Sequence, residues 1–214
     1  GTKPTVGVLC SYTLYPNRTM KIVYIVLAIL LVLFAISQLW AQSQVKGIEV
    51  YPYRVDKAYD GIEVRRYERA NFIYVTKDAK TYAESSSEGF RMLAGYIFGG
   101  NAREQKFAMT SPVVMEMDSN VTMKFLVPAQ YTLDELPTPT NAQVRFTTES
   151  ERTVAAITFG GSANDEKIQQ YKNELFQRLT EEGISHSGQW SFLGYDPPFK
   201  LFGRRNEVVV DVQL

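Results

Sequence analysis

The chain has 214 residues, 45% of them hydrophobic, and its 23 basic and 23 acidic residues give a formal net charge of +0. This content is enough for one globular domain with a short anchor and too small for two large domains. Phosphate neutralisation supplies most of the affinity of nucleic-acid-binding proteins, so the lack of a basic excess argues against such a partner. A single cysteine, Cys10, and a single histidine, His186, exclude disulfides and Cys/His zinc sites in the globular part.

An apolar segment covers residues 22–40 and begins with the run IVYIVLAILLVLF. As a helix it would rise about 28 Å, close to the thickness of the hydrocarbon core of a bilayer. Trp40 is suited to the membrane interface as an aromatic anchor. We therefore predict a transmembrane segment over 21–41, preceded by an N-terminal extension over 1–20.

A cleaved signal peptide is the alternative interpretation of the same segment. Lys21 would then be its short basic start, and the Ala-Ile-Ser sequence at 35–37 would be its cleavage site. We favour the anchor because the apolar run is long for a signal peptide. Lys3, Arg18 and Lys21 precede the span without an acidic residue, which predicts a cytoplasmic N-terminus and an extracytoplasmic domain.

The polar residues 42–58 are predicted to form a linker that becomes ordered toward its end, and the domain is predicted over 59–214. In chain order its first half is predicted to form strands over 62–67 and 72–75, a helix from Thr81 to Gly99, and strands over 107–116 and 122–127. Thr81 and Glu84 have the spacing of a capping box, which indicates the helix start. Pro112 predicts a bulge or an edge in the strand that contains it.

Residues 128–141 contain three prolines and are predicted to be a connecting loop. The second half repeats the order, with strands over 144–148 and 153–159, a helix over 165–182 capped by Ser162 or Asn164, and strands over 190–195 and 207–212. The fold class is therefore α+β. We predict that the duplicated ββαββ units form a distorted eight-stranded antiparallel barrel with two packed helices and a cleft between helix and sheet.

Signals of catalysis are weak in this sequence, and we predict that the protein is not an enzyme. There is no G-x-S-x-G sequence, and Gly99-Gly100 follows a helix instead of opening one, unlike a phosphate-binding loop. His186 lies in a polar segment and is predicted to be a solvated turn residue. A hydrolase that uses a cleft carboxylate such as Glu116 or Glu207 as general base is kept as the less favoured alternative.

The segment 194–208 combines a stiff Asp-Pro-Pro turn with aromatic and basic residues. A loop that carries Lys200 beside an apolar wall has the chemistry to receive a planar ligand with carboxylates. The methionines at predicted strand and helix positions are interpreted mainly as core residues, with soft walls of an apolar pocket as the alternative.

From about Tyr59 to Leu214 the chain resembles the SOUL/HBP haem-binding family. The resemblance depends on the order and spacing of the strings EVRRY at 63–67, YI at 96–97 leading to MTSPV at 109–113, FGG at 159–161, GYDPPFK at 194–200 and GRRNEV at 203–208. The family's pseudo-twofold α+β barrel agrees with the duplicated pattern. With the apolar segment, the resemblance predicts a bacterial, membrane-anchored member of the family.

The resemblance implies that haem or another tetrapyrrole binds in an apolar cleft beside the first helix of the domain. The residues that it places around the ligand are Phe90, Arg91, Leu93, Ala94, Ile97, Met109, Phe199 and Lys200. Lys200 matches a lysine that meets the haem propionates in animal members. Ser87 stands where some members have an arginine, and Arg91, one turn on, is the expected substitute.

Axial ligation of the iron differs from that proposed for some members. Their histidine matches Arg66 here, so an axial imidazole from this position is excluded and ligation by Met or Tyr is the alternative. Related barrels in bacterial regulators bind hydrophobic cations and drugs. Other apolar small molecules are therefore the alternative ligand class. We expect the domain to be a monomer and the protein to have no metal site of its own.

Overall fold

The computed structural model describes residues 18–44 and 47–213. The chain divides into two compact units, residues 1–40 and residues 41–214. The domain boundaries above remain predictions from the sequence, but β-structure already begins at Glu49, inside the predicted linker.

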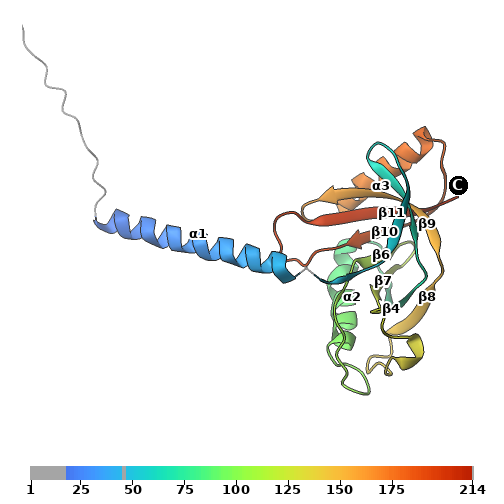
Figure 1. The fold of residues 1–214 in the computed structure, drawn as a ribbon, viewed down its shortest axis with the longest axis horizontal. Helices are drawn as coiled ribbons and strands as arrows, with labels where there is room; N and C mark the ends of the chain where they lie inside the picture. The colour runs from blue at the N-terminus through green and yellow to red at the C-terminus, as the bar shows by residue number, and fades with distance from the viewer. Residues whose placement is uncertain (1–17, 45–46, 214) are drawn as a thin grey trace, which may run out of the picture. The chain divides into compact units, whose positions relative to one another are not determined.

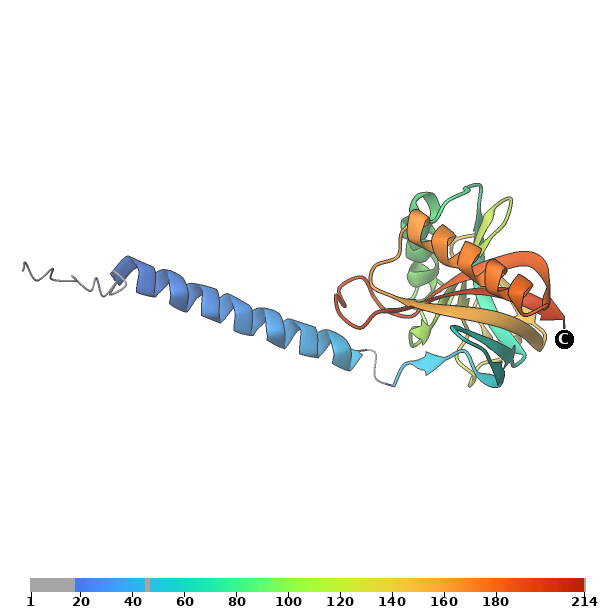
Figure 2. The same ribbon diagram turned by 90° about the horizontal axis from the view of Figure 1, so that it is seen from above.

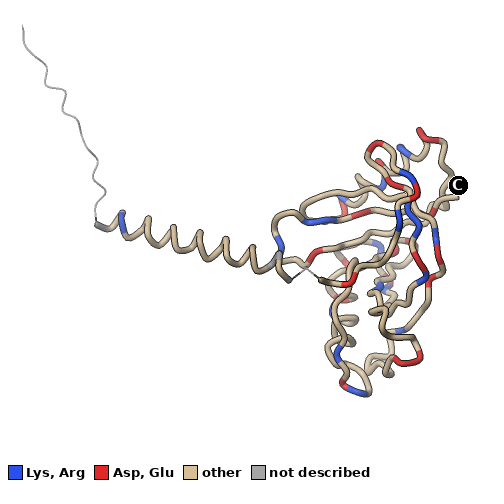
Figure 3. Tube along the Cα trace, viewed as in Figure 1, with Lys and Arg blue, Asp and Glu red and all other residues tan. Residues whose placement is uncertain are grey.

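The first unit contains most of helix α1, Arg18–Gln44. Its large apolar side chains are exposed on all sides from Met20 to Trp40, and no charged residue follows Lys21 within it (Figure 3). A helix that is apolar all round is suited to a bilayer. Thr19–Trp40, with 22 residues and a mean hydropathy of 2.8, is long enough to span a membrane, and a signal sequence near the N-terminus has the same properties.

The second unit is the α+β domain (Figure 1). Its described helices are α2 (Tyr82–Ile97), α3 (Asp165–Glu181) and a short 3-10 helix (Leu133–Glu135). Its described strands are β1 (Glu49–Val50), β2 (Tyr53–Ala58), β3 (Ile62–Tyr67), β4 (Ala70–Lys77), β5 (Thr110–Ser111), β6 (Val113–Met117), β7 (Val121–Leu126), β8 (Arg145–Glu149), β9 (Arg152–Gly160), β10 (Ser185–Gly194) and β11 (Arg205–Gln213).

Nine of these strands form one antiparallel sheet in the order β2-β3-β9-β11-β10-β6-β7-β4-β8. The sheet curls into a half-barrel (Figures 1 and 2), which confirms the predicted barrel-like α+β fold. It has nine strands instead of the expected eight because β2, from the predicted linker, pairs with β3 between Tyr53↔Tyr67 and Ala58↔Glu63. The two-stranded pair of β1 with β5 is parallel.

Both long helices pack on one face of the sheet, as their side chains in the main core cluster show. Thr81 caps α2 by accepting a hydrogen bond from the backbone N–H of Glu84 at 3.3 Å. Asn164, one of the two predicted caps, accepts from Lys167 N at 2.8 Å and begins α3. The Asp165 carboxylate then accepts from the N–H of Tyr82 at 2.6 Å. This bond joins the N-termini of the two helices.

Neither α2 nor α3 contributes to the cluster on the other face of the sheet. Its apolar residues are fewer and are mainly aromatic or small, for example Tyr51, Tyr67 and Phe72. Because side chains alternate between the two faces of a strand, Val208 and Val210 pack under the helices and Val209 packs on the opposite face. The sheet therefore separates two different environments.

Two expectations from the sequence need correction. His186 lies in strand β10 and not in a turn, and the irregular register between His186 and Trp190 explains why the polar sequence around it resembles a turn. The predicted strand 107–116 is divided at Pro112 into β5 and β6, which pair with different partners. A proline has no N–H to donate, so it interrupts the strand there.

Candidate ligand site beside α2 and the loop after β10

A cavity of about 490 Å³ lies along the C-terminal half of α2. Its volume is within the range of small-molecule sites. The residues that line it are Glu88, Arg91, Met92, Gly95, Tyr96, Gly100, Thr140 and Asn141.

The amphipathic pattern of α2 explains the position of the cavity. Leu93, Ala94 and Ile97 are buried against the sheet, so Arg91 and Gly95 face away from it and are exposed. A Cβ added at Gly95 would have no neighbouring atom within 4 Å. The glycine therefore leaves open space on the helix surface.

The loop after the 3-10 helix forms the opposite wall. The Tyr96 hydroxyl donates to Pro137 O at 2.9 Å, Ala102 N donates to Thr138 O at 2.9 Å, and Thr140 N donates to Gly100 O at 3.0 Å. Burial raises the pKa of Tyr96 to about 12. The phenol is therefore protonated at neutral pH and already used as a donor.

The predicted site residues of α2 have different surroundings in the structure. Arg91 lines the cavity. Phe90 is exposed on the helix and packs edge-on against Phe125 with ring centroids 5.3 Å apart. Leu93, Ala94 and Ile97 lie in the core. Their described contacts hold α2 on the sheet, and none of the three lines the cavity.

Met109, Phe199 and Lys200 come from other segments. Met109 is partly buried against the main core. Lys200 Nζ lies 2.6 Å from Asp196 Oδ1, within its own loop. The structure thus brings Lys200 to an acidic partner, and neither Lys200 nor Phe199 lines the cavity beside α2.

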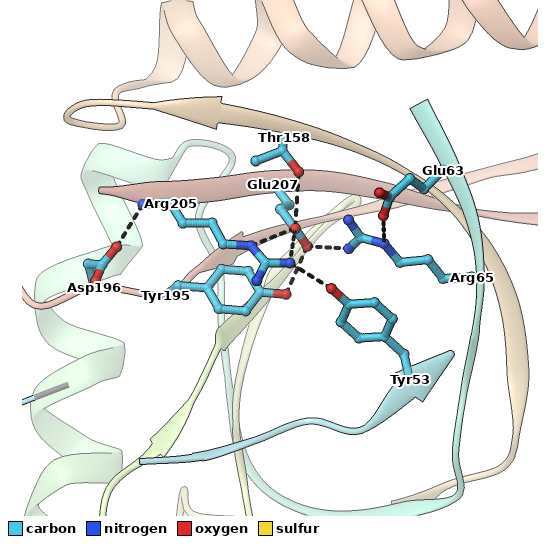
Figure 4. Close-up of polar contacts among 8 residues, drawn as sticks. All are labelled: Tyr53, Glu63, Arg65, Thr158, Tyr195, Asp196, Arg205 and Glu207. Atoms are coloured by element: carbon cyan, nitrogen blue, oxygen red, sulfur yellow. Dashed lines mark hydrogen bonds and ion pairs between the residues drawn. The ribbon is translucent and has the colours of Figure 1, made fainter. Parts of the chain in front are cut away.

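A buried polar cluster holds the base of that loop (Figure 4). Glu207 of β11 is fully buried and accepts from Arg65 Nη1 at 2.8 Å, from Arg205 Nη2 at 2.6 Å and from the Tyr195 hydroxyl at 2.8 Å. The Thr158 hydroxyl also donates to Glu207 Oε1, at 3.1 Å. Tyr195 and Arg205 are the two ends of the loop, so one carboxylate joins both.

The charges in this cluster are strongly coupled. Burial opposes ionisation of Glu207, but the hydrogen bonds and charges of Arg65, followed by those of Arg205, outweigh it and lower its pKa. Burial, and then the charge of Glu207, raise the pKa of Tyr195. Glu207 is therefore an ionised carboxylate with saturated acceptors, which makes it a poor general base. Glu116, the other carboxylate considered for catalysis, is paired with Lys124.

Neither Arg66, at the position of the family's histidine, nor His186 lines the cavity. Arg66 is 2.9 Å from Asp56. The ring of His186 lies 4.3 Å from that of Phe176, on α3. In residues 18–44 and 47–213 there is no group of three or more His, Cys, Asp or Glu side chains that could hold a metal ion.

Sequence reasoning singled out Glu207 but missed part of the cavity and most of the polar cluster around that carboxylate. A glycine inside a helical pattern, here Gly95, was a usable signal, because glycine destabilises a helix interior relative to alanine. Arg205 and Glu207 are two apart in a strand and therefore share a face. Their partner Arg65 is distant in sequence, and nothing local predicts it.

Comparison with known proteins agrees with this architecture. Residues 48–211 match the family model described as SOUL heme-binding protein. The chain is 33% identical over 159 residues to Heme-binding protein 1 of Xenopus laevis, covering 70% of this chain and 83% of that protein. It is 28% identical over 166 residues to Heme-binding protein 2 of Mus musculus, covering 73% and 80%.

Solved structures show the same fold at low sequence identity. The C-terminal domain of EcmrR superposes with a TM-score of 0.57 at 9% identity, covering 75% of this chain and 98% of that one. A structure described as a hydrolase from Listeria innocua has a TM-score of 0.51 at 12% identity, covering 71% and 91%. These two likenesses concern the fold alone. The family match covers most of the domain, and this chain belongs to the SOUL heme-binding protein family.

Proposed function

We propose that this protein is a membrane-anchored, non-catalytic binding protein that holds haem or another tetrapyrrole beside α2. The observation that carries the proposal is the cavity of about 490 Å³ with Arg91 on its wall, in a chain of the SOUL heme-binding protein family. The relatives are named heme-binding proteins. The paired state of Glu207 supports a binding role over hydrolysis.

The residues of the cavity fit such a ligand in part. Met92 and Gly95 offer an apolar wall, and Arg91 offers a planar cation for a carboxylate. No histidine lines this cavity in the described residues. Tyr96 is engaged as a donor to Pro137 O. Among the lining residues, the Met92 thioether would be the donor available to a haem iron, and Arg91 would meet the propionates.

Five of the predicted residues that do not line the cavity keep roles within this proposal. Phe90 extends the apolar surface of α2, while Leu93, Ala94, Ile97 and Met109 support it from the core. Helix α1 supplies the single-pass anchor. The basic residues Lys3, Arg18 and Lys21, which precede the apolar run, support an orientation with the domain outside the cytoplasm. We propose a monomeric domain.

A haem titration of the full chain in detergent micelles, followed at the Soret band, tests the proposal. We expect a saturable band, and Arg91→Glu is expected to weaken binding about tenfold because it replaces attraction by repulsion at the propionates. Lys80→Glu, a change of the same charge at an exposed residue before α2, is the matched control. The absence of a saturable band, or equal affinities for the two variants, would refute the haem role at this cavity.

A second ligand class, other apolar small molecules, is favoured by the absence of histidine from the described cavity lining. Binding to the native state raises the unfolding midpoint. A thermal-shift screen of the full chain against iron-free porphyrins and unrelated apolar compounds separates the two classes. A shift with unrelated compounds and none with porphyrins supports the second class.

A further inference from the structure

Two charged residues, Glu88 and Arg91, are among the described residues that line the cavity beside α2. They are three positions apart on one helix, so their side chains are neighbours on its surface. A glutamate that precedes an arginine in this way favours an ion pair with it. Such a pair would neutralise the guanidinium at the wall where a ligand carboxylate has to bind.

The structure pairs Glu88 with a different cation. Lys77 Nζ lies 2.7 Å from Glu88 Oε1. Within residues 18–44 and 47–213, Arg91 forms no ion pair, and it is exposed at the cavity. The charge of Arg91 is therefore open to a ligand, while that of Glu88 is balanced from the side.

The alternation of strand β4 explains why Lys77 reaches α2. Lys77 is the last residue of this strand, and Ile73 and Val75 lie in the main core cluster below the helices. Side chains alternate between the faces of a strand, so Lys77 continues the face of Ile73 and Val75 at the edge of the core. Its side chain is 22% exposed, against 46% for Glu88. The sheet thus fixes the lysine, and the more mobile glutamate on the helix surface comes to it.

The other acidic residue of α2 is already used elsewhere. Glu84, in the first turn, accepts a hydrogen bond from the backbone N–H of Lys80 at 3.0 Å. Glu88 is therefore the acidic residue of this helix that is placed to compete with a ligand for Arg91. Its pairing with Lys77 prevents that competition.

We propose that Lys77 is a positioning residue for ligand binding, which holds Glu88 and thereby keeps Arg91 free for an anionic group of the ligand. The inference deepens the proposed function and rests on it. Lys77 does not line the cavity, so it acts through Glu88. A free guanidinium beside a neutralised carboxylate selects ligands that carry a carboxylate.

Removal of the lysine charge changes the nearest partner of Glu88. Without Lys77, the carboxylate turns to Arg91, and a ligand carboxylate has to displace it. The displaced Glu88 would then stay unpaired near the bound ligand and repel it. Both effects lower the affinity for a carboxylate-bearing ligand and leave a neutral ligand unaffected.

The first test is a haem titration of the full chain in detergent micelles with Lys77→Met, Glu88→Gln and the double variant. Methionine keeps most of the unbranched stem of lysine without its charge. We expect Lys77→Met to weaken haem binding about threefold in the wild-type background and less than about 1.5-fold in the Glu88→Gln background. Lys80→Met, which removes the charge of an exposed lysine three residues on, is the matched control and should leave the affinity unchanged.

Equal weakening by Lys77→Met in the two backgrounds would overturn the inference, because Lys77 would then attract the ligand by its own charge. Haem dimethyl ester, which has no free carboxylate, is the second probe. Its affinity should be the same for the wild type and for Lys77→Met. Equal losses for haem and for the diester would also overturn the inference, since they indicate damage to the packing of the site.

Chemical modification tests the arrangement without any ligand. Phenylglyoxal reacts with free guanidinium groups, and mass spectrometry gives its rate at Arg91. Lys77→Met should slow this rate about twofold, and the addition of Glu88→Gln should restore it. An unchanged rate in Lys77→Met would overturn the inference whether or not haem binds. The expected rates in a wild type without a saturable Soret band would instead refute the proposed haem function and support only the part of the inference that Lys77 keeps Arg91 free.

Discussion

The two faces of the sheet hold different kinds of polar residue. On the helix side, Arg91 stands exposed at an open cavity. On the face opposite α2 and α3, Arg65 and Arg205 close on the buried carboxylate of Glu207. An exposed cation keeps its bonding capacity for a ligand, whereas a buried one must be paired within the protein. We therefore assign ligand binding to the first region. The second region supports the loop between Tyr195 and Arg205.

The largest effect on stability is expected from removing the buried carboxylate of Glu207. Glu207→Gln removes the buried carboxylate that pairs with the buried Arg65 and the partly exposed Arg205, and it should lower the free energy of unfolding by about 3–5 kcal/mol. Glu63→Gln removes a carboxylate from the same Arg65, but its side chain is 41% exposed, so its effect should be below about 1 kcal/mol. Denaturant unfolding of the full chain in detergent measures both. Equal losses would show that burial of the cluster is energetically unimportant.

On the helix side, the corresponding test is a substitution that fills the cavity and lowers the affinity for haem. Gly95→Trp places an indole where an added Cβ meets no atom within 4 Å. It should weaken haem binding by about thirtyfold, or about 2 kcal/mol, and leave the unfolding midpoint nearly unchanged. The Soret titration measures the first quantity and thermal unfolding the second. Unchanged affinity would move the ligand site away from this part of α2.

The pH dependence of stability sharpens the role of Glu207. Its pKa in the folded protein is lowered, so it lies below the unfolded value of about 4.3. The stability that its ionised form contributes is therefore complete above about pH 4.3 and is lost as the pH falls through the folded pKa. The difference in unfolding free energy between wild type and Glu207→Gln should be constant from about pH 7 to pH 5 and shrink below about pH 4. A difference that grows toward low pH would contradict the ionised state.

The smallest expected effect comes from Gly95→Ala, which changes the stability of α2 without filling the cavity. Gly95→Ala should stabilise the protein by about 0.5–1 kcal/mol, because alanine loses less backbone entropy than glycine in a helix. Its methyl group is too small to fill the cavity, so haem affinity should stay within about twofold. Thermal unfolding and the Soret titration check the two outcomes. Destabilisation would show that Gly95 is needed for packing.

The pattern of the chain was sufficient for most of the secondary structure. Alternation predicted β3 at Ile62–Tyr67 with the bounds that the structure has, and Thr81 and Asn164 marked two helix starts. These features depend on neighbouring residues. The edge strand β2 was missed because its burial pattern does not alternate, as its outer residues are exposed on both faces. His186 was misplaced because the strand around it is irregular.

The candidate site was predictable only in part. Helical spacing around Leu93 identified the right helix, but the same spacing describes the face that packs in the core. The cavity lies on the neighbouring stripe with Arg91, against a loop more than forty residues on. A ligand stripe and a core stripe have similar composition, and only the position of the sheet distinguishes them.

By itself, the sequence determined the apolar span, the two amphipathic helices, the alternating strands and the family to which the chain belongs. These depend on local periodicity and on strings of residues in a given order. The tertiary structure alone decided that Arg65 meets Glu207 from 142 positions away and that Gly95 opens a cavity. Such contacts depend on which strands become neighbours in the sheet, and this is set by burial of the whole core and not by any one segment.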